Sequence, residues 1–298
     1  MKRVLLLLLS LTVIGCGNFN TQVCAKSTTK TPVQYAKIEK ISYKEIEDLF
    51  ATQDKYVQKY DVESLKKLYS ENFTNNDGYP KDVYFSLVKE TWETYPDITY
   101  KTKIKSIKVN GNYAVVETQE TAVATTKEED LVPAMGELNS LSNCRYHLEK
   151  LSDHWVITGE DVLDEYSTLK YGDARFVKMN LSAPEMIKAG TPYTAKLSVD
   201  LPAEQVVIAS INREKIVNPA PKPDEKFRKL SEEQVLERMF TSNTENLNEY
   251  NVAAIGITKA VPVSEDNVRV FMNGLAFIMT RVNVVPKNNF AKIGDSDE

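Results

Sequence analysis

The chain has 298 residues, of which 42% are hydrophobic, which is enough apolar material for about two globular domains. Residues 41–165 carry 14 lysine and arginine residues against 24 aspartate and glutamate residues, a net charge of −10, whereas residues 166–298 balance at 17 against 17. An acidic first domain repels phosphate backbones, so we expect no nucleic-acid partner. The three cysteines have no CxxC or Cys/His spacing, so we expect no disulfide framework, no metal site and no cofactor.

The N-terminus has the pattern of an export signal. Residues 1–3 are Met-Lys-Arg, and residues 4–14 form an apolar run that is too short to span a bilayer. The run ends in Val-Ile-Gly-Cys16, which resembles the bacterial lipobox, in which the cysteine is lipidated and becomes the mature N-terminus. This resemblance implies a signal peptide over 1–15 and a lipid-anchored protein of the cell envelope that faces away from the cytoplasm.

An ordinary signal peptide is the alternative to lipidation. The small-residue site Val23-Cys24-Ala25 would then be the cleavage position, and the protein would be secreted or periplasmic. In either case residues 16–40 are polar and predict a tether.

Three helices are predicted before the first long strands. Apolar side chains recur at spacings of three, four and seven from Ile46 to Val57, which indicates an amphipathic helix. Asp61 is placed to cap a second, shorter helix. Pro80 suits the first turn of a third helix, and Pro96 ends it.

A long β-hairpin over residues 97–123 is predicted next. Both arms are rich in β-branched residues, and Asn110-Gly111 between them favours a tight type I′ turn. Residues 143–151 and 154–163 predict two further antiparallel strands, joined by a turn at Ser152-Asp153.

The order helix, short helix, helix and strand meander resembles the nuclear transport factor 2-like (polyketide cyclase-like) superfamily over residues 41–168. The likeness is carried by residues 60–73 after a long helix, by the central hairpin, and by Leu-Ser-Asp-His-Trp-Val-Ile at 151–157. It implies an α+β domain in which a curved antiparallel sheet wraps around helices into a cone. Residues 126–142 are longer than the hairpin turn that this plan needs, and we interpret them either as a flap over the mouth of the cone or as a tolerated surface insertion.

The resemblance also limits what function can be inferred. Members of the superfamily include isomerases, dehydratases and cyclases as well as non-catalytic binding modules, and their domains often dimerise through the outer face of the sheet. The fold alone therefore does not choose between an enzyme and a binding protein.

Three carboxylates are candidates for a catalytic base inside such a cone, namely Asp77, Glu117 and Glu120. A buried carboxylate with a raised pKa is what an isomerase or dehydratase needs, although a surface position is the ordinary one for each. Alternation along 143–151 puts Cys144, Tyr146 and Leu148 inward, so His147 is expected outside.

Three aromatic residues of the predicted third helix, Tyr84, Trp92 and Tyr95, are candidates for ligand binding. If that helix lines the cavity of a cone, these rings would hold a small apolar or sugar-like ligand. Core packing against the sheet is the alternative.

The second predicted domain, 169–290, is all-β with one helix. The helix at 231–240 is predicted from a capping box formed by Ser231 and Gln234, and Asn273-Gly274 is predicted to turn between the last two strands. The pattern resembles an immunoglobulin-like sandwich, and residues 291–298 are expected to form a frayed tail. The strands are predicted at 175–181, 192–200, 205–211, 251–260, 267–272 and 275–285.

The sequence thus favours a non-catalytic bacterial envelope lipoprotein that binds a small ligand or another envelope component. The alternative is an isomerase, cyclase or dehydratase that works inside the first domain. A homodimer through the outer sheet face is an additional expectation from the resemblance.

Overall fold

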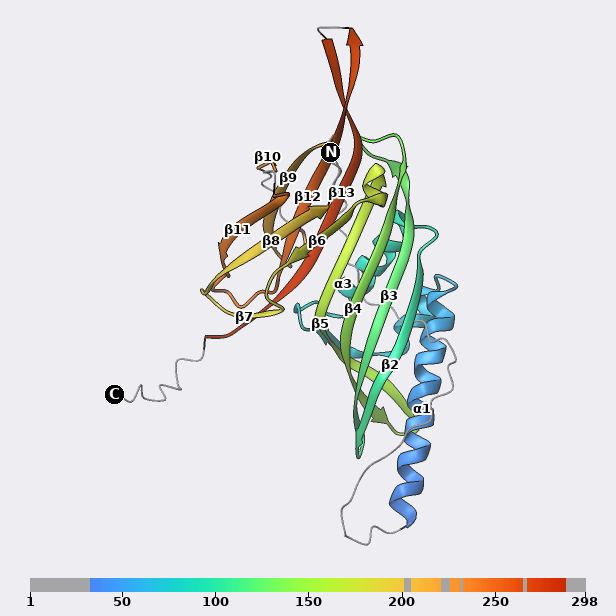
Figure 1. Ribbon diagram of the computed structural model, residues 1–298. Coiled ribbons are helices and arrows are strands. Elements are labelled where there is room, and N and C mark those ends of the chain that lie inside the picture. The colour runs from blue at the N-terminus through green and yellow to red at the C-terminus, as the bar shows by residue number, and fades with distance from the viewer. Residues whose placement is uncertain (1–32, 201–204, 221–225, 231–232, 265–266, 288–298) are drawn as a thin grey trace, which may run out of the picture. The chain divides into compact units, whose positions relative to one another are not determined.

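The computed structural model describes residues 33–200, 205–220, 226–230, 233–264 and 267–287. Its contacts divide the chain into two compact units. Among the described residues, the N-terminal unit contains 33–127 together with 139–163, and the C-terminal unit contains 128–138 and the described residues from 164 to 287. Most of the described chain is antiparallel sheet, and helices are few (Figure 1). None of the described helices is long and apolar enough to cross a membrane.

The predicted signal peptide, Cys16 and the predicted tail at 291–298 lie outside the described residues. The predicted tether at 16–40 is corrected in its last part, because α1 (Val33–Val57) begins inside it. Residues 33–57 contain no proline or glycine, so nothing in this stretch interrupts a helix once it has begun.

Two shorter helices follow α1 in the N-terminal unit. In α2 (Val62–Lys66) the Asp61 carboxylate accepts a hydrogen bond from the Ser64 backbone N–H at 3.0 Å, which confirms the predicted cap. The third helix, α3 (Lys81–Thr94), begins directly after Pro80 and ends two residues before Pro96.

The sheet of the N-terminal unit has the strand order β5-β4-β3-β2, with β1 paired in parallel to β5. Strand β1 was not predicted from the sequence. The bounds are β1 (Tyr69–Asn75), β2 (Thr99–Asn110), β3 (Tyr113–Glu129), β4 (Met135–Leu151) and β5 (His154–Gly172).

The predicted hairpin is present, but its turn differs. Asn110 pairs with Tyr113, so the loop consists of Gly111 and Asn112. Of these two residues only Gly111 has a positive φ, +60°, as the first loop position of a type II′ turn requires. The expected type I′ turn would need positive φ at both loop positions.

Residues 126–142 form neither a flap nor a loose insertion. Strands β3 and β4 continue through most of this segment and leave only 130–134 outside regular strand. Residues 128–138 of this segment belong to the C-terminal unit, where Arg175 pairs with Glu137 at 2.9 Å.

The C-terminal unit contains two sheets. One has the order β10-β9-β12-β13-β5, with β7 beside β13, and the other has the order β11-β8-β6. Small and branched side chains from both sheets, among them Leu197, Ile211, Ile255 and Ile278, share one buried core. The bounds are η1 (Asp173–Phe176), β6 (Lys178–Ser182), β7 (Met186–Lys188), β8 (Pro192–Asp200), β9 (Val206–Lys215), β10 (Arg228–Lys229), β11 (Val235–Thr241), β12 (Glu249–Ser264) and β13 (Asn267–Val285).

The predicted helix at 231–240 is wrong for the described part of that segment. Strand β11 occupies it and pairs antiparallel with β8 from Val235 to Thr241. Its side chains alternate, with Leu236 and Phe240 packed against the shared core. Tertiary pairing has therefore overridden the helix-favouring composition of this stretch.

The predicted turn at Asn273-Gly274 is also wrong, because β13 runs through it without a break. Gly274 pairs with Ile257, and the next pair is Met272 with Thr258, so Asn273 is the extra residue of a β-bulge. A Cβ on Gly274 would lie 2.7 Å from the backbone nitrogen of Ala174. Glycine is therefore needed for the close approach of two backbones.

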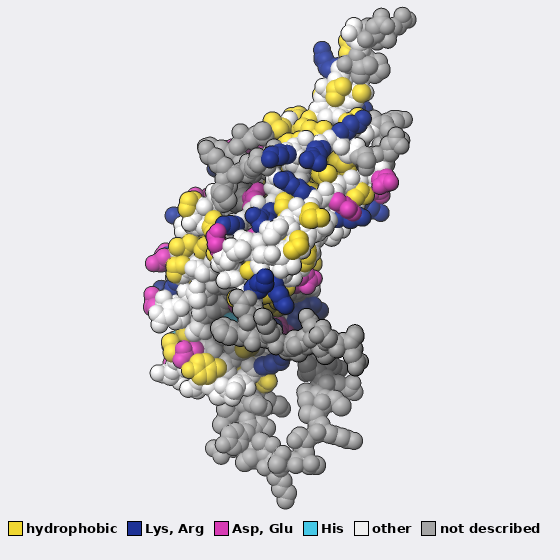
Figure 2. All heavy atoms as spheres, turned by 90° about the vertical axis from the view of Figure 1, so that its left-hand side faces the viewer, with side chains coloured by type: hydrophobic (Ala, Val, Ile, Leu, Met, Phe, Trp, Pro, Cys, Tyr) yellow, Lys and Arg dark blue, Asp and Glu magenta, His cyan; other side chains and the backbone are white. Residues whose placement is uncertain are grey.

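The ends of β12 and β13 form a two-stranded ribbon beyond their neighbours (Figures 1 and 2). Pairing of β12 with β9 ends at Thr258, and pairing of β13 with β5 ends at Gly274. Apolar side chains on this ribbon, including Val263 and Val270, are exposed.

Candidate functional site

Two glutamates and three tyrosines meet in the interior of the N-terminal unit. Glu120 on β3 is 3% exposed and Glu160 on β5 is 1% exposed. We call the five residues the carboxyl–phenol cluster. Its tyrosines, which are also buried and come from β1, α3 and β4, are Tyr69, Tyr84 and Tyr146.

Hydrogen bonds bind the cluster together. The Tyr146 hydroxyl donates to Glu120 Oε1 at 3.0 Å, and the Thr118 hydroxyl donates to the same oxygen at 2.7 Å. On the other side the Tyr84 hydroxyl donates to the carboxyl group of Glu160. Each glutamate thus has a phenol as a donor, which lowers the cost of burying it.

Aromatic rings surround these polar groups. The Tyr84 ring lies 4.9 Å from the ring of Phe73 and 5.9 Å from that of Tyr69, measured between centroids. The Tyr146 ring meets Phe50 edge-to-face at 5.4 Å. The contacts of Tyr84 with Phe73 and of Tyr146 with Phe50 are edge-to-face and hold the rings in fixed orientations.

Burial and the nearby carboxyl groups keep the phenols neutral. Desolvation is the larger cause, and it raises the pKa of Tyr69, Tyr84 and Tyr146 well above the ordinary value. The negative charges of Glu160 and Glu120 raise the pKa of all three further, which places the five groups in one electrostatic site. At neutral pH the cluster can donate hydrogen bonds from phenols and accept them at carboxyl groups.

The three predicted carboxylates occupy different environments. Only Glu120 belongs to the cluster. Asp77 is half-buried in the turn after β1, where its N–H donates to Asn75 Oδ1 at 3.1 Å. Glu117 lies on the opposite face of β3 from Glu120, because strand side chains alternate, and it forms an ion pair with Arg145 at 3.0 Å. The hydrogen bond from Arg145 is the main cause that lowers the pKa of Glu117.

The predicted aromatic residues of α3 are all buried, but they do not form one group. Tyr84 belongs to the cluster. Trp92, two helical turns further on, packs edge-to-face on Tyr60 at 5.2 Å. Tyr95 follows the last residue of α3, and its backbone N–H donates to the Thr91 carbonyl.

Both histidines of the chain lie outside the cluster. The His147 ring is half-exposed on the outer face of β4 and is 2.9 Å from Asp161 Oδ2, as its predicted orientation implied. His154, at the start of β5, is 3.0 Å from Asp153 Oδ1 and is mainly exposed. Since the sequence has only two histidines, no imidazole is available to the cluster.

Glu160 and Tyr69 were missed as site residues. Glu160 was missed because the phase of β5 changes: Trp155 and Ile157 are buried, and so are Glu160 and Val162. The pairing of β1 with β5 is irregular at this point, between Ile157 and Gly159. Counting back in twos from Val162 would have found Glu160, whereas counting forward from Trp155 places it outside.

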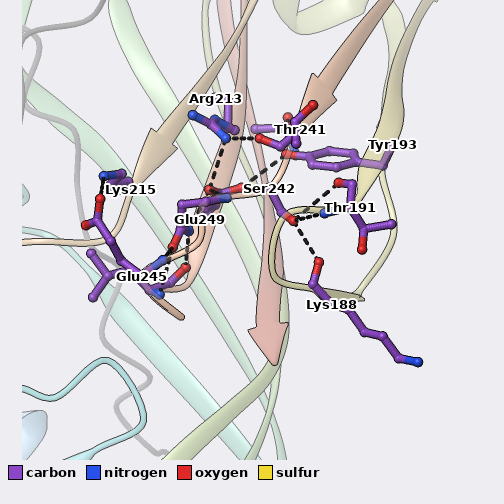
Figure 3. Close-up of polar contacts among 12 residues, drawn as sticks. Lys188, Thr191, Tyr193, Arg213, Lys215, Thr241, Ser242, Glu245 and Glu249 are labelled. Carbon is purple, nitrogen blue, oxygen red and sulfur yellow. Dashed lines mark hydrogen bonds and ion pairs between the residues drawn. The ribbon is translucent and has the colours of Figure 1, made fainter. Parts of the chain in front are cut away.

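A second polar cluster lies in the C-terminal unit (Figure 3). Glu249 is fully buried and accepts hydrogen bonds from the backbone N–H and the side-chain amide of Asn243 at 2.8 and 2.7 Å. Arg213 approaches the same carboxylate at 3.4 Å. Because Asn243 belongs to the loop before β12, we assign this cluster to loop closure.

Comparisons with known proteins find structural neighbours only. No protein-family model matches the chain, and no curated protein matches it. An NTF2-like protein with a cystatin-like fold from Novosphingobium aromaticivorans is 12% identical, with 46% of this chain and 90% of that chain covered and a TM-score of 0.36. A conserved protein from Planctomyces limnophilus is 13% identical, with 41% and 94% covered and a TM-score of 0.35.

A third solved structure, a putative SnoaL-like polyketide cyclase from Jannaschia sp. CCS1, is 10% identical, with 46% of this chain and 90% of that chain covered and a TM-score of 0.27. The NTF2-like and SnoaL-like structures thus each match less than half of this chain. Their likeness is one of fold and says nothing of activity.

Proposed function

We propose that the protein is a non-catalytic lipoprotein of the bacterial cell envelope whose N-terminal unit binds a small ligand or another envelope component. The N-terminal sequence, with its short apolar run and Val-Ile-Gly-Cys16, supports export and lipid anchoring. The unit itself is proposed to be a cone of the nuclear transport factor 2-like kind, since its helices and strand meander follow that order.

The carboxyl–phenol cluster is the observation that carries the binding function. It brings polar groups from β1, α3, β3, β4 and β5 together inside an aromatic surrounding. A few convergent polar groups among aromatic side chains are what a small-molecule site requires for orientation and specificity. A core that served packing alone would not need two buried glutamates, because buried carboxyl groups cost free energy.

An enzyme of the isomerase, cyclase or dehydratase kind is the second candidate. It is favoured by Glu120, a buried carboxyl group with the Tyr146 hydroxyl 3.0 Å away, which is a combination suited to acid–base chemistry. Against it stands the position of both histidines on the outside, which leaves glutamate and tyrosine as the titratable groups described in the cluster.

The outer face of the N-terminal sheet is proposed as a homodimer surface. It carries the ion pair of Glu117 with Arg145 and the contact of the His147 ring with Asp161. We propose that the C-terminal unit is an immunoglobulin-like sandwich, because two sheets share one core. We further propose that it serves as a rigid spacer or a docking module.

Two experiments test the proposal. Replacing Cys16 by Ser in the full chain should release the protein from the membrane fraction, and unchanged retention would refute lipid anchoring. Binding is tested with apolar and sugar-like compounds, for which Tyr84→Ala should weaken affinity by about 1–3 kcal/mol. Turnover of a bound compound that is lost in Glu120→Gln would decide for the enzyme.

A further inference from the structure

The ribbon formed by the ends of β12 and β13 presents a strand edge without a neighbouring strand. The pairing of β13 with β5 ends at Gly274, and from Asn267 to Met272 the strand that pairs with β13 is β12 (Figure 1). Among the described strands, none pairs with the other edge of β13 over residues 268–272. An isolated two-stranded ribbon is only marginally stable in water, so a further strand on this edge would stabilise it.

The composition of this β13 edge favours pairing with another strand. Residues 268–272 are Val-Arg-Val-Phe-Met, with a single charge at Arg269 and no proline. Val270 is 62% exposed and Phe271 is 44% exposed. Exposed apolar side chains on an unpaired edge mark an interaction site, because proteins usually protect such edges with charges or proline.

The edge on the β12 side of the ribbon is protected in this way. Its arm contains Pro262, which has no N–H to donate to an added strand. The same arm carries Lys259, which is exposed. An added strand is therefore directed to the β13 edge.

The β13 edge is complementary to itself. Residues 268–272 are centred on Val270, so two copies that pair antiparallel over this whole segment place the two Val270 residues opposite each other on a two-fold axis. In this register Arg269 of each copy lies opposite Phe271 of the partner subunit. A guanidinium group is attracted to an aromatic ring, and the symmetry provides this contact twice.

Charge disfavours the neighbouring register. An axis at Arg269 would set the two guanidinium groups directly opposite each other, and like charges in that position destabilise a strand pair. The axis at Val270 avoids this repulsion and uses the full length of the unpaired segment. Because the described arms of the ribbon, 258–264 and 267–272, contain no acidic residue, a ring is the partner that they offer to Arg269.

We infer that the β13 edge of the ribbon pairs antiparallel with the same edge of a second copy of this chain, with Val270 on the two-fold axis. The two ribbons then form one four-stranded sheet. This contact goes beyond the proposed function, because the homodimer surface proposed above lies on the N-terminal sheet, whereas the ribbon belongs to the C-terminal unit.

Disulfide cross-linking of the full chain tests this contact. Directly opposed residues of an antiparallel pair have Cα atoms about 4.5–5.5 Å apart, which is within the distance that a disulfide spans. The substitution Val270→Cys is made in a Cys24→Ser parent, in which Cys144 is buried and Cys16 stays in place for anchoring. Under mild oxidation Val270→Cys should form a disulfide-linked dimer on a non-reducing gel, and the parent should not.

The matched control for position is Val263→Cys in the same parent. Val263 is 61% exposed, as Val270 is 62% exposed, but it lies on the β12 arm of the ribbon. Val270→Cys should form the dimer about tenfold or more faster than Val263→Cys, because only the former brings two thiols within disulfide distance.

Two substitutions of Phe271, each combined with Val270→Cys, test the register. Phe271→Glu sets a carboxylate opposite Arg269 of the partner subunit and should keep the dimer. Phe271→Lys sets a like charge there, twice across the axis, and should lower the dimer yield by about tenfold. The Phe271 side chain is largely exposed, so both variants should fold, which circular dichroism verifies.

Each result decides for or against the ribbon contact. Equal dimer yields from Val270→Cys and Val263→Cys would overturn it, and so would equal yields from the two Phe271 variants. A disulfide from Val270→Cys to a different protein, without the dimer, would show that the added strand is not a second copy. Adding Arg145→Glu, on the outer face of the N-terminal sheet, should leave the cross-link unchanged; loss of the cross-link would assign the dimer to that face and overturn the ribbon contact.

Discussion

Removing the Glu249 carboxylate should open the loop before β12 and destabilise the C-terminal unit (Figure 3). The side chain is fully buried, and its donors are the N–H and amide of Asn243 and the hydroxyl of Tyr193 at 3.4 Å. Asn243 in turn accepts from the backbone N–H groups of Glu245 and Leu247 at 2.9 and 3.1 Å, so the carboxylate is linked through Asn243 to the turn of the loop.

The magnitude follows from what each substitution leaves unsatisfied. Glu249→Ala strands two buried donors of Asn243, at about 1–3 kcal/mol each, so we expect a total loss of about 3–5 kcal/mol in the free energy of unfolding. Arg213→Met removes the charge partner, but the Arg213 side chain is 29% exposed, so its pairing is partly screened. We expect that change to cost less than about 1.5 kcal/mol.

Urea unfolding followed by far-UV circular dichroism measures these losses. Both tryptophans, Trp92 and Trp155, lie in the N-terminal unit, so their fluorescence serves as an internal reference that Glu249→Ala should not shift. Glu237→Gln, which breaks an ion pair with Lys196 whose side chains are 52% and 55% exposed, is the control and should stay within about 0.5 kcal/mol of the parent. Equal losses for Arg213→Met and Glu249→Ala would refute the reasoning, because the ion pair would then dominate the loop contacts.

Three further predictions follow from the described contacts. The cluster tyrosines have pKa values above the ordinary value of 10, so the stability that each contributes as a neutral phenol is present below pH 10 and is lost as pH rises through the pKa of the folded state, by about 1.4 kcal/mol per pH unit for each. In an alkaline titration, part of the tyrosinate absorbance should therefore appear only as the circular dichroism signal of the folded chain is lost. Complete titration of the tyrosines in a chain that stays folded would contradict this prediction. In urea unfolding, Gly111→Ala should lower the free energy of unfolding by about 1 kcal/mol, because alanine is strained at a φ of +60°. Gly172→Ala should lower it by at least about 2 kcal/mol more, because the added Cβ would lie 2.3 Å from the Asn273 carbonyl oxygen. Equal losses for the two variants would be evidence against close packing at Gly172. Asp61→Ala should lower the free energy of unfolding by about 1 kcal/mol and Asp61→Asn by much less, and a matching loss for both would show that the cap hydrogen bond is not the cause.

Local patterns were sufficient where one face of a strand is buried and the other is wet. Strand β8 was predicted at its observed bounds, 192–200, because Tyr193, Ala195, Leu197 and Val199 alternate with polar side chains. The inward face of β4 was predicted for the same reason. In each case the two-residue alternation of apolar and polar residues in the sequence matches the burial pattern of the folded strand.

Segments that depend on distant partners were not predictable in this way. Residues 235–241 have a helix-favouring composition, and they become a strand only because β8, which is far away in sequence, offers an edge. Asn273-Gly274 carries the usual signal for a hairpin turn, but flanking pairs with β12 and β5 hold it as a bulge inside one strand. An Asn-Gly pair shows only that the backbone can adopt the conformation of a turn or a bulge. The pairing with neighbouring strands decides which of the two forms.

The candidate site shows the same division between local and distant information. Glu117 and Glu120 are an odd number of residues apart on one strand, so alternation alone puts them on opposite faces, and the apolar residues Val116 and Ala122 assign Glu120 to the interior. In β5 the alternation of buried and exposed side chains changes phase before Glu160, at the point where the pairing with β1 is irregular. Alternation counted from Trp155 therefore places Glu160 outside, and alternation counted from Val162 places it inside. The alternation of each strand therefore decides which carboxyl groups lie together in the interior. The sequence predicts this alternation only up to the nearest irregularity in the strand pairing.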